Sequence, residues 1–256
     1  MNRNLLIVFC ALFMSGASLY AQDANAIMTS AKNRVTSETI YSRSRMVITA
    51  RNGTTTNRVI EQISKDGPNG ARTVIIFIEP ASVAGTRFLT MDNASGGTDQ
   101  WIYLPSSRTL RRIAASDSGG NFMGTDFSYD DISSMDRDVS LDTHTILREE
   151  TLNNRLCYVI QSVPRTSNQY SKTITWIDKE NYLIYKAEMY NSRNEVVKIM
   201  EMSDFRSVQG RITPMQTRIS TVTAGTSTTI FMEGIRYDTP IDEGYFTTRF
   251  LETGRP

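Results

Sequence analysis

Four aspartates, Asp117, Asp126, Asp130 and Asp131, lie close together in a glycine-containing stretch of the sequence. Carboxylates in such a group can hold a calcium ion, or act as the acid and base of a glycosidase. Their spacing does not match that of a calcium-binding loop. Ser128 and Asp131 instead fit the S-x-x-D pattern of a capping box, and Asp126 could itself cap a helix. We therefore expect these acids to begin a short helix.

Other residues that could carry catalysis are sparse. His144 is the single histidine, and one of the two cysteines, Cys10, lies in the N-terminal segment, which leaves Cys157. A histidine and cysteine metal site needs more ligands than these. A histidine-activated nucleophile would need a nucleophile-elbow pattern, which the sequence lacks, as it lacks a phosphate loop and a dinucleotide fingerprint. We expect no catalytic residues, no metal and no cofactor, and Cys157 as a buried small side chain.

The acids share their stretch with glycines and large apolar residues, which helix capping does not explain. These residues are Gly120, Phe122, Met123, Gly124, Phe127 and Tyr129. Glycine gives the backbone freedom to move, and large apolar side chains are costly in water, so they should pack against an apolar surface. We predict that residues 119–135 form a movable lid, with a fixed corner of the core as the alternative.

The N-terminal segment predicts export. One basic residue, Arg3, precedes an apolar run from Leu5 to Met14, and small residues follow as far as Ala21. This pattern is typical of a secretory signal peptide, which we place at residues 1–21, with a retained membrane anchor as the alternative. Residues 22–256 should then form one domain. They hold 27 basic and 27 acidic residues, since Arg3 is the only charge removed, and this balance argues against a nucleic-acid partner.

Strands must position these side chains. Residues 23–35 have the apolar spacing of a short helix, and most of the remaining sequence alternates apolar and polar residues between tight turns, such as Asn52-Gly53 and Asn153-Asn154. This pattern predicts a mainly β protein with one large antiparallel sheet of about eleven strands. Because large twisted sheets curl, we expect a half-open β-barrel with short helices covering its concave face. Residues 243–252 should be a short helix or an edge strand.

Alternation along the strands assigns a set of apolar residues to the inner face of the sheet. They are Met46, Ile48, Ile60, Ile75, Phe77, Phe88, Trp101, Tyr103, Ile174, Trp176, Tyr185, Met200 and Ile230. A slip of one residue would turn any of them to the opposite face. We predict that they line an apolar cavity, with core packing as the alternative for each.

Several segments carry a family resemblance. In order they are "FIEPASVAGTRFL" (77–89), "DQWIYLPSSRTLRRI" (99–113), "GGNFMGTDFSYDDI" (119–132), "TWIDKENYLIYKAEMY" (175–190) and "EGYFTTRFLE" (243–252). Together they resemble the outer-membrane lipoprotein-sorting protein family, relatives of the LolA-type periplasmic carriers. The resemblance implies a half-open barrel that holds the acyl chains of a lipoprotein or another lipid in the periplasm and moves them toward the outer membrane. It also implies a possible inner-membrane exporter as partner, and we expect a monomer.

The resemblance further implies a cavity arginine that holds the lid. Arg87, Arg108, Arg111 and Arg112 are candidates by position, although they could equally face outward from their strands.

Two other functions stay open at this point: a non-transporting binding or adaptor subunit of an envelope export complex, and a hydrolase that uses the aspartates of residues 126–131. A cavity of several hundred Å³ would favour the carrier, since ligand sites have about this size. An exposed apolar patch would favour the adaptor, and paired carboxylates with raised pKa values in a polar cleft would favour the hydrolase.

Overall fold

The computed structural model describes residues 23–67, 70–93, 97–134 and 137–256. The signal peptide predicted for residues 1–21 lies outside these ranges. Within them, none of the helices combines the length and the apolar character that crossing a membrane requires.

One antiparallel sheet contains all the strands of the described residues, and they number thirteen. The strands are β1 (Thr39–Thr49), β2 (Thr55–Gly67), β3 (Gly70–Glu79), β4 (Arg87–Asp92), β5 (Thr98–Leu104), β6 (Thr109–Arg112), β7 (Asp142–Leu152), β8 (Arg155–Pro164), β9 (Lys172–Asp178), β10 (Ile184–Tyr190), β11 (Val196–Val208), β12 (Arg211–Thr221) and β13 (Thr226–Tyr237). The expected segment at residues 99–113 is divided by a turn into β5 and β6.

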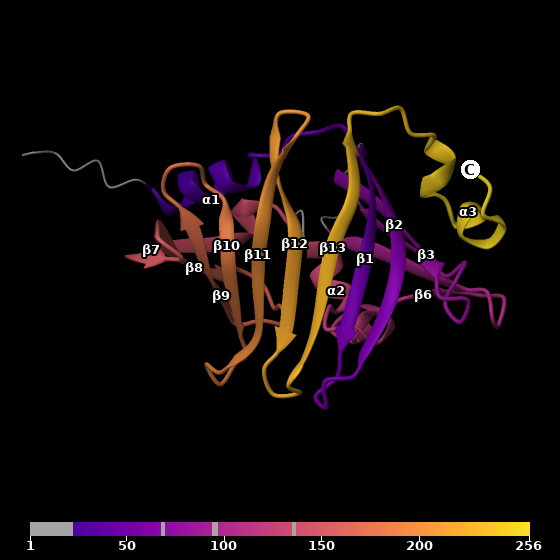
Figure 1. Ribbon diagram of the computed structural model, residues 1–256, viewed down its shortest axis with the longest axis horizontal. Helices are drawn as coiled ribbons and strands as arrows, with labels where there is room; N and C mark the ends of the chain where they lie inside the picture. The colour runs from indigo at the N-terminus through magenta and orange to yellow at the C-terminus, as the bar shows by residue number, and fades with distance from the viewer. Residues whose placement is uncertain (1–22, 68–69, 94–96, 135–136) are drawn as a thin grey trace, which may run out of the picture.

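The order of strands in space explains the shape of the sheet. It runs β6-β5-β4-β3-β2-β1-β13-β12-β11-β10-β9-β8-β7, so two meanders are joined where β1 pairs with β13. The sheet curls without closing, and β6 and β7 form its two edges (Figure 1). The predicted mainly β, half-open architecture is confirmed. The turn expected at Asn153-Asn154 is also confirmed, since both residues have positive φ and the hairpin of β7 and β8 closes across it.

In the part of the chain that the structure describes, three short α-helices accompany the sheet: α1 (Ala24–Lys32), α2 (Tyr129–Ser133) and α3 (Thr248–Thr253). The helix expected at residues 23–35 is therefore present, with Asp23 as its N-cap, and it packs through Ile27 on the inner face of β8 and β9. Figure 1 shows α2 behind the front strands, inside the curl. The C-terminal segment is helical, and α3 packs on the outer face against β4 and β5.

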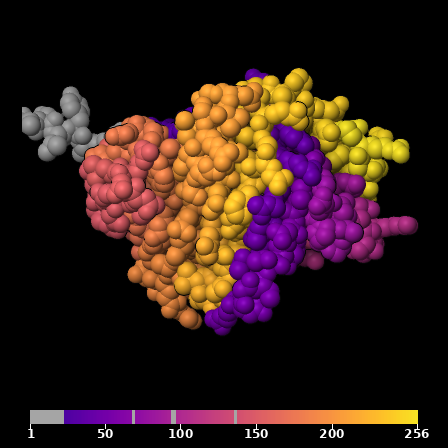
Figure 2. All heavy atoms as spheres, viewed as in Figure 1, coloured from indigo at the N-terminus to yellow at the C-terminus, as the bar shows by residue number. Residues whose placement is uncertain are grey.

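Both faces of the middle of β3 and β4 are buried. In β3, Ile75 and Phe77 point inward to a core cluster beneath the loop before α2, whereas Val74 and Ile76 point outward to the cluster under α3. This accounts for the nearly continuous apolar run of β3. The outer face of β11, β12, β13 and β1 has no helix over it, as Figure 2 shows.

Candidate ligand-binding cleft

The concave face of the sheet forms a cleft of about 1320 Å³ that is open to solvent. One end is apolar and is formed by strand side chains together with Phe122 and Phe127 of the loop before α2. The other end is polar and includes Ser64, Thr73 and Thr90. The cleft is therefore amphipathic, whereas the sequence predicted a uniformly apolar wall.

The thirteen residues predicted to line the cavity fall into three groups. Those that line the cleft are Met46, Ile60, Ile75 and Ile230. Those that pack in the core cluster on the same face are Ile48, Phe77, Phe88 and Met200. Those that lie on the outer face are Trp101, Tyr103, Ile174, Trp176 and Tyr185.

The assignment of this last group to the cavity is wrong, because a shift of one position reverses the face of a strand residue. Trp101 and Tyr103 pack with the cluster under α3. Trp176 packs with Cys157, which is buried as expected, and the Nζ atom of Lys186 lies 4.5 Å from the centre of its ring.

The loop before α2 covers the apolar end of the cleft, and we call residues 119–134 the roof. Phe122 and Phe127 are each only 1% exposed. The Phe122 ring centre lies 5.0 Å from that of Phe88 and 5.7 Å from that of Phe77. The apolar residues of the roof therefore pack on the concave face. Residue 135, the last of the predicted lid, lies outside the described residues, and the movement of the lid stays a prediction.

An arginine that was not among the candidates contacts the roof. Arg58 of β2 donates a hydrogen bond from Nη1 to the carbonyl oxygen of Met123, at 2.6 Å, and its guanidinium lies 5.7 Å from the centre of the Phe77 ring. Burial lowers the pKa of Arg58 from its usual value. The alternation of β2 could have identified this residue, because Arg58 shares the inward face with Ile60.

The four candidate arginines make other contacts. Arg87 lies on the outer face and donates to the carbonyl oxygen of Leu251 at the end of α3, at 2.7 Å. Arg111 pairs with Asp117, and Arg112 pairs with Asp99. Arg108 lies in the turn between β5 and β6, with φ of 51°. Their assignment to the lid is therefore wrong. Arg87 and Arg112 lie on the outer face, and Arg111, which lies opposite the inward-facing Ile102, forms its ion pair with Asp117, outside the roof.

Asp126 anchors the roof to the hairpin of β12 and β13, and the N-cap of α2 is Ser128, so the alternative that Asp126 itself caps the helix is wrong. Its carboxylate is buried and accepts hydrogen bonds from the hydroxyls of Thr221, Thr226 and Thr228, at 2.7, 2.5 and 2.8 Å. Its backbone N–H donates to Thr228 Oγ1 at 2.9 Å. Each carboxylate oxygen thus has at least one hydroxyl partner.

Asp131 anchors the other side of the roof. The predicted capping box with Ser128 is confirmed, because the side chain of each accepts from the backbone N–H of the other. The carboxylate also contacts Lys198 Nζ at 2.6 Å, and it accepts from the hydroxyl of Tyr170 at 2.7 Å. Burial and the negative charge of Asp131 raise the pKa of Tyr170, and burial and the same charge raise the pKa of Asp130.

The aspartates therefore do not converge on a substrate site. Asp126 and Asp131 are held by different strands, and Asp117 pairs with an exposed arginine. These contacts leave neither Asp126 nor Asp131 directed into the cleft as an acid or a base, and they do not support the hydrolase.

His144 lies in the wall of the cleft opposite β2 and β3. Its Nε2 is 2.9 Å from the carbonyl oxygen of Val139, and its Nδ1 is 2.7 Å from Ser162 Oγ. Because a carbonyl oxygen can only accept, Nε2 carries the proton and Nδ1 accepts from the serine. Both side chains line the cleft, and the sequence did not predict their pairing.

Comparisons with known proteins agree with this fold. A family model whose description is "-like: Uncharacterized protein" matches residues 69–253, which is more than half of the chain. The chain belongs to this family. No curated protein matches the sequence.

Solved structures share the fold over nearly the whole chain. A DUF1329 family protein from Desulfovibrio piger is 28% identical, with a TM-score of 0.84 over 89% of this chain and 97% of that one. An outer-membrane lipoprotein-sorting protein domain from Vibrio parahaemolyticus is 24% identical, with a TM-score of 0.83 over 90% and 98% of the two chains. A LolA superfamily protein from Nitrosomonas europaea is 20% identical, with a TM-score of 0.72 over 89% and 98%. The predicted resemblance to lipoprotein-sorting proteins is confirmed.

Proposed function

We propose that this protein is a periplasmic carrier that binds the acyl chains of a lipid or lipoprotein in its cleft and moves them toward the outer membrane. The observation that carries the proposal is the apolar end of the cleft, which is enclosed by the strand side chains of Met46, Ile60 and Ile230 and by the roof. The similarity in fold to an outer-membrane lipoprotein-sorting domain and to a LolA superfamily protein supports it.

The energetics of lipid transfer favour such a site. Transfer of an acyl chain of about fifteen methylenes from lipid into water costs about 12 kcal/mol of free energy, at about 0.8 kcal/mol per methylene. A carrier must therefore shelter the chain without binding it much more tightly than a bilayer does. The cleft, of about 1320 Å³, exceeds the usual size of a ligand site, about 300–1,000 Å³, and has room for a chain of this kind.

The roof has the features of a loop that opens to admit cargo. Met123 has φ of 50°, a left-handed conformation that costs about 1–3 kcal/mol in a residue other than glycine. The hydrogen bond from Arg58 and the aromatic contacts of Phe122 offset this cost in the closed loop. Because the closed roof is strained at Met123 and is held by a small number of contacts, it can exchange with an open form in which those contacts are broken.

The remaining parts of the proposal follow from the sequence. A signal peptide at residues 1–21 would export the chain, which would then act as a monomer without a cofactor. An inner-membrane exporter would load it. A non-transporting adaptor with this fold would not need the cleft, so binding in the cleft distinguishes the two functions.

The test is binding of a fluorescent fatty acid, in the form of its uncharged methyl ester, by the delipidated protein and by two variants at adjacent positions. Ile230 lies in the cleft on β13, and Phe231, the next residue, lies on the outer face beneath Arg45. Ile230→Trp should fill the apolar end and weaken binding of the probe at least about tenfold, which is about 1.4 kcal/mol. Phe231→Trp should bind as the wild type does, with both variants folded by circular dichroism.

If the wild type fails to bind the fluorescent probe, or if Ile230→Trp binds it with unchanged affinity, the carrier proposal is wrong and the adaptor function is favoured.

A further inference from the structure

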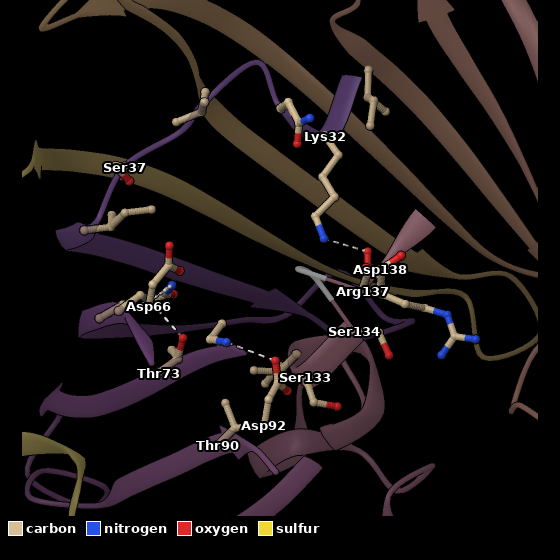
Figure 3. A pocket seen from close by; sticks show the side chains of 18 of the residues that line it. Lys32, Ser37, Asp66, Thr73, Thr90, Asp92, Ser133, Ser134, Arg137 and Asp138 are labelled. Atoms are coloured by element: carbon tan, nitrogen blue, oxygen red, sulfur yellow. Dashed lines mark hydrogen bonds between the residues drawn. The ribbon is translucent and has the colours of Figure 1, made fainter. Parts of the chain in front are cut away.

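A row of polar side chains crosses the inner face of four adjacent strands in the first half of the sheet, and three of the four line the cleft. Ser64, Thr73, Thr90 and Gln100 lie opposite one another on β2, β3, β4 and β5. Figure 3 shows Thr73 and Thr90 at the pocket, close to α2. We call these four residues the polar row.

The polar row separates an apolar region from an acidic one. Two positions toward the roof, the inward side chains are Ile75 on β3 and Phe88 on β4. Two positions the other way, they include Asp66 on β2 and Asp92 on β4, which line the mouth of the cleft. A ligand that lies along the strands would therefore meet hydrocarbon first, then hydroxyl groups, and then carboxylates.

Two atoms of the polar row are buried and have no hydrogen-bond partner. Thr90 is 6% exposed and Gln100 is 5% exposed, and Thr90 Oγ1 and Gln100 Oε1 are both without a partner. The other half of the row is satisfied, since Ser64 and Thr73 share a hydrogen bond of 2.8 Å. Buried polar atoms in native proteins are almost always paired, and Thr90 lines the cleft, so its hydroxyl points to a ligand that supplies a hydrogen-bonding partner.

The carboxylates of Asp66 and Asp92 beside the row can only accept, which favours a ligand that donates. Gln100 does not line the cleft, and its Nε2 donates to the carbonyl oxygen of Tyr129 in the roof at 3.1 Å.

The charges around the cleft indicate the sign of that ligand. The described residues that line the cleft include six acids, Glu38, Asp66, Asp92, Asp138, Asp142 and Asp238, and three bases, Lys32, Lys65 and Arg137. Two of the bases are already in ion pairs: Lys65 with Glu243 at 2.6 Å, and Arg137 with Asp142 at 3.0 Å. An anionic headgroup would meet a surplus of negative charge here.

We propose that the cargo is a lipid whose headgroup donates hydrogen bonds and has no net negative charge, bound with its headgroup on the polar row and its chain beneath the roof. Hydroxyl and amine headgroups share this chemistry. The inference rests on the proposed function and adds the class of cargo and the orientation in which it is bound.

The experiment compares three amphiphiles with the same dodecyl chain, each below its micelle concentration, as competitors of the fluorescent fatty acid. Dodecyl glucoside carries neutral hydroxyls, dodecylamine carries an ammonium group, and dodecyl sulfate carries an anion. The glucoside or the amine, or both, should compete at least about tenfold better than the sulfate, because like charges disfavour the anion. The better of the two identifies whether hydroxyl or amine is preferred.

Thr90→Val removes the unpartnered hydroxyl and keeps the shape of the side chain. It should weaken the preferred amphiphile about three- to tenfold, the usual contribution of a hydrogen bond, and leave the sulfate unchanged. The stability of the free protein should stay the same or rise, because no hydrogen bond is lost. The control is Thr229→Val on the outer face of β13, which should change neither.

The results separate this inference from the proposed function. If the amphiphiles bind but the sulfate competes equally well or better, or if Thr90→Val weakens all three alike, the headgroup inference is wrong while the carrier stands. If the probe itself does not bind, the proposed function fails and the inference with it. If the probe binds and none of the three amphiphiles displaces it, the headgroup inference is wrong while the carrier stands.

Discussion

A pair of phenylalanines tests whether the roof moves. Phe122 of the roof and Phe88 of β4 are 1% and 0% exposed, and their ring centres are 5.0 Å apart. They therefore occupy the same cluster with nearly the same burial. They differ in what holds them, because Phe88 belongs to the sheet and Phe122 belongs to a loop fixed by a few polar anchors.

The expected losses of stability follow from this difference. Replacing a buried phenylalanine by alanine in a packed core costs about 3–5 kcal/mol of unfolding free energy. Phe88→Ala should lose this amount, since its contacts end only when the sheet unfolds. The loss of unfolding free energy in Phe122→Ala cannot exceed the free energy of opening the roof. A larger loss in the closed form would leave the open form as the more stable folded state, and that form does not use the contacts of Phe122. We expect the loss in Phe122→Ala to be smaller by at least about 1.4 kcal/mol, a factor of ten in the unfolding constant.

The assays are urea denaturation of the two variants and hydrogen exchange of the wild type. The N–H of Phe122 bonds to the carbonyl of Phe127 at 2.7 Å, and that of Tyr129 bonds to the carbonyl of Gly120 at 3.1 Å. These amides should exchange much faster than those of β3, because local opening exposes them without unfolding the sheet. Adding Met123→Ala to Phe122→Ala should change uptake of the fluorescent fatty acid while the protein stays folded.

Equal losses in Phe122→Ala and Phe88→Ala, together with roof amides as protected as those of β3, would refute this reasoning. The roof would then be a fixed corner of the core. Unchanged uptake by the folded double variant would also contradict the lid.

Two further predictions concern the anchor at α2. Asp131→Asn leaves the buried Lys198 without its counterion and should cost about 3–5 kcal/mol of unfolding free energy. Adding Lys198→Met should recover part of this loss. Additive losses of the two substitutions in urea denaturation would contradict the ion pair. The pKa of Asp130 is raised above its usual value of 3.8. The folded protein therefore loses stability as the pH rises from 3.8 through the raised pKa, where the buried carboxyl must ionise. Asp130→Asn should therefore raise the Tm at neutral pH and leave fatty-acid binding intact, whereas loss of function in a folded variant would favour catalysis.

The sequence predicted the features that depend on neighbouring residues. The turn at Asn153-Asn154 and the capping box of Ser128 and Asp131 involve residues a few positions apart, and their patterns were sufficient. The curled sheet followed from alternation and from the shortage of helix.

Features that depend on distant residues were missed or misplaced. Asp126 binds Thr228, 102 positions away, and no local pattern reports such a contact. The face of Trp176 was misassigned because β9 turns Thr173 and Thr175 toward the cleft and Trp176 toward the outer cluster, so the more apolar side of this strand is not the inner one. The polar row depends on the register of four strands, which the sequence does not specify.

Mass spectrometry of lipids extracted from the protein, purified from its own cell envelope, tests the central claim most directly. The account predicts a bound lipid in the wild type, enriched over the envelope and lost from Ile230→Trp but kept in Phe231→Trp. A wild-type protein that carries no lipid, or the same lipids in equal amount as Ile230→Trp, would contradict it.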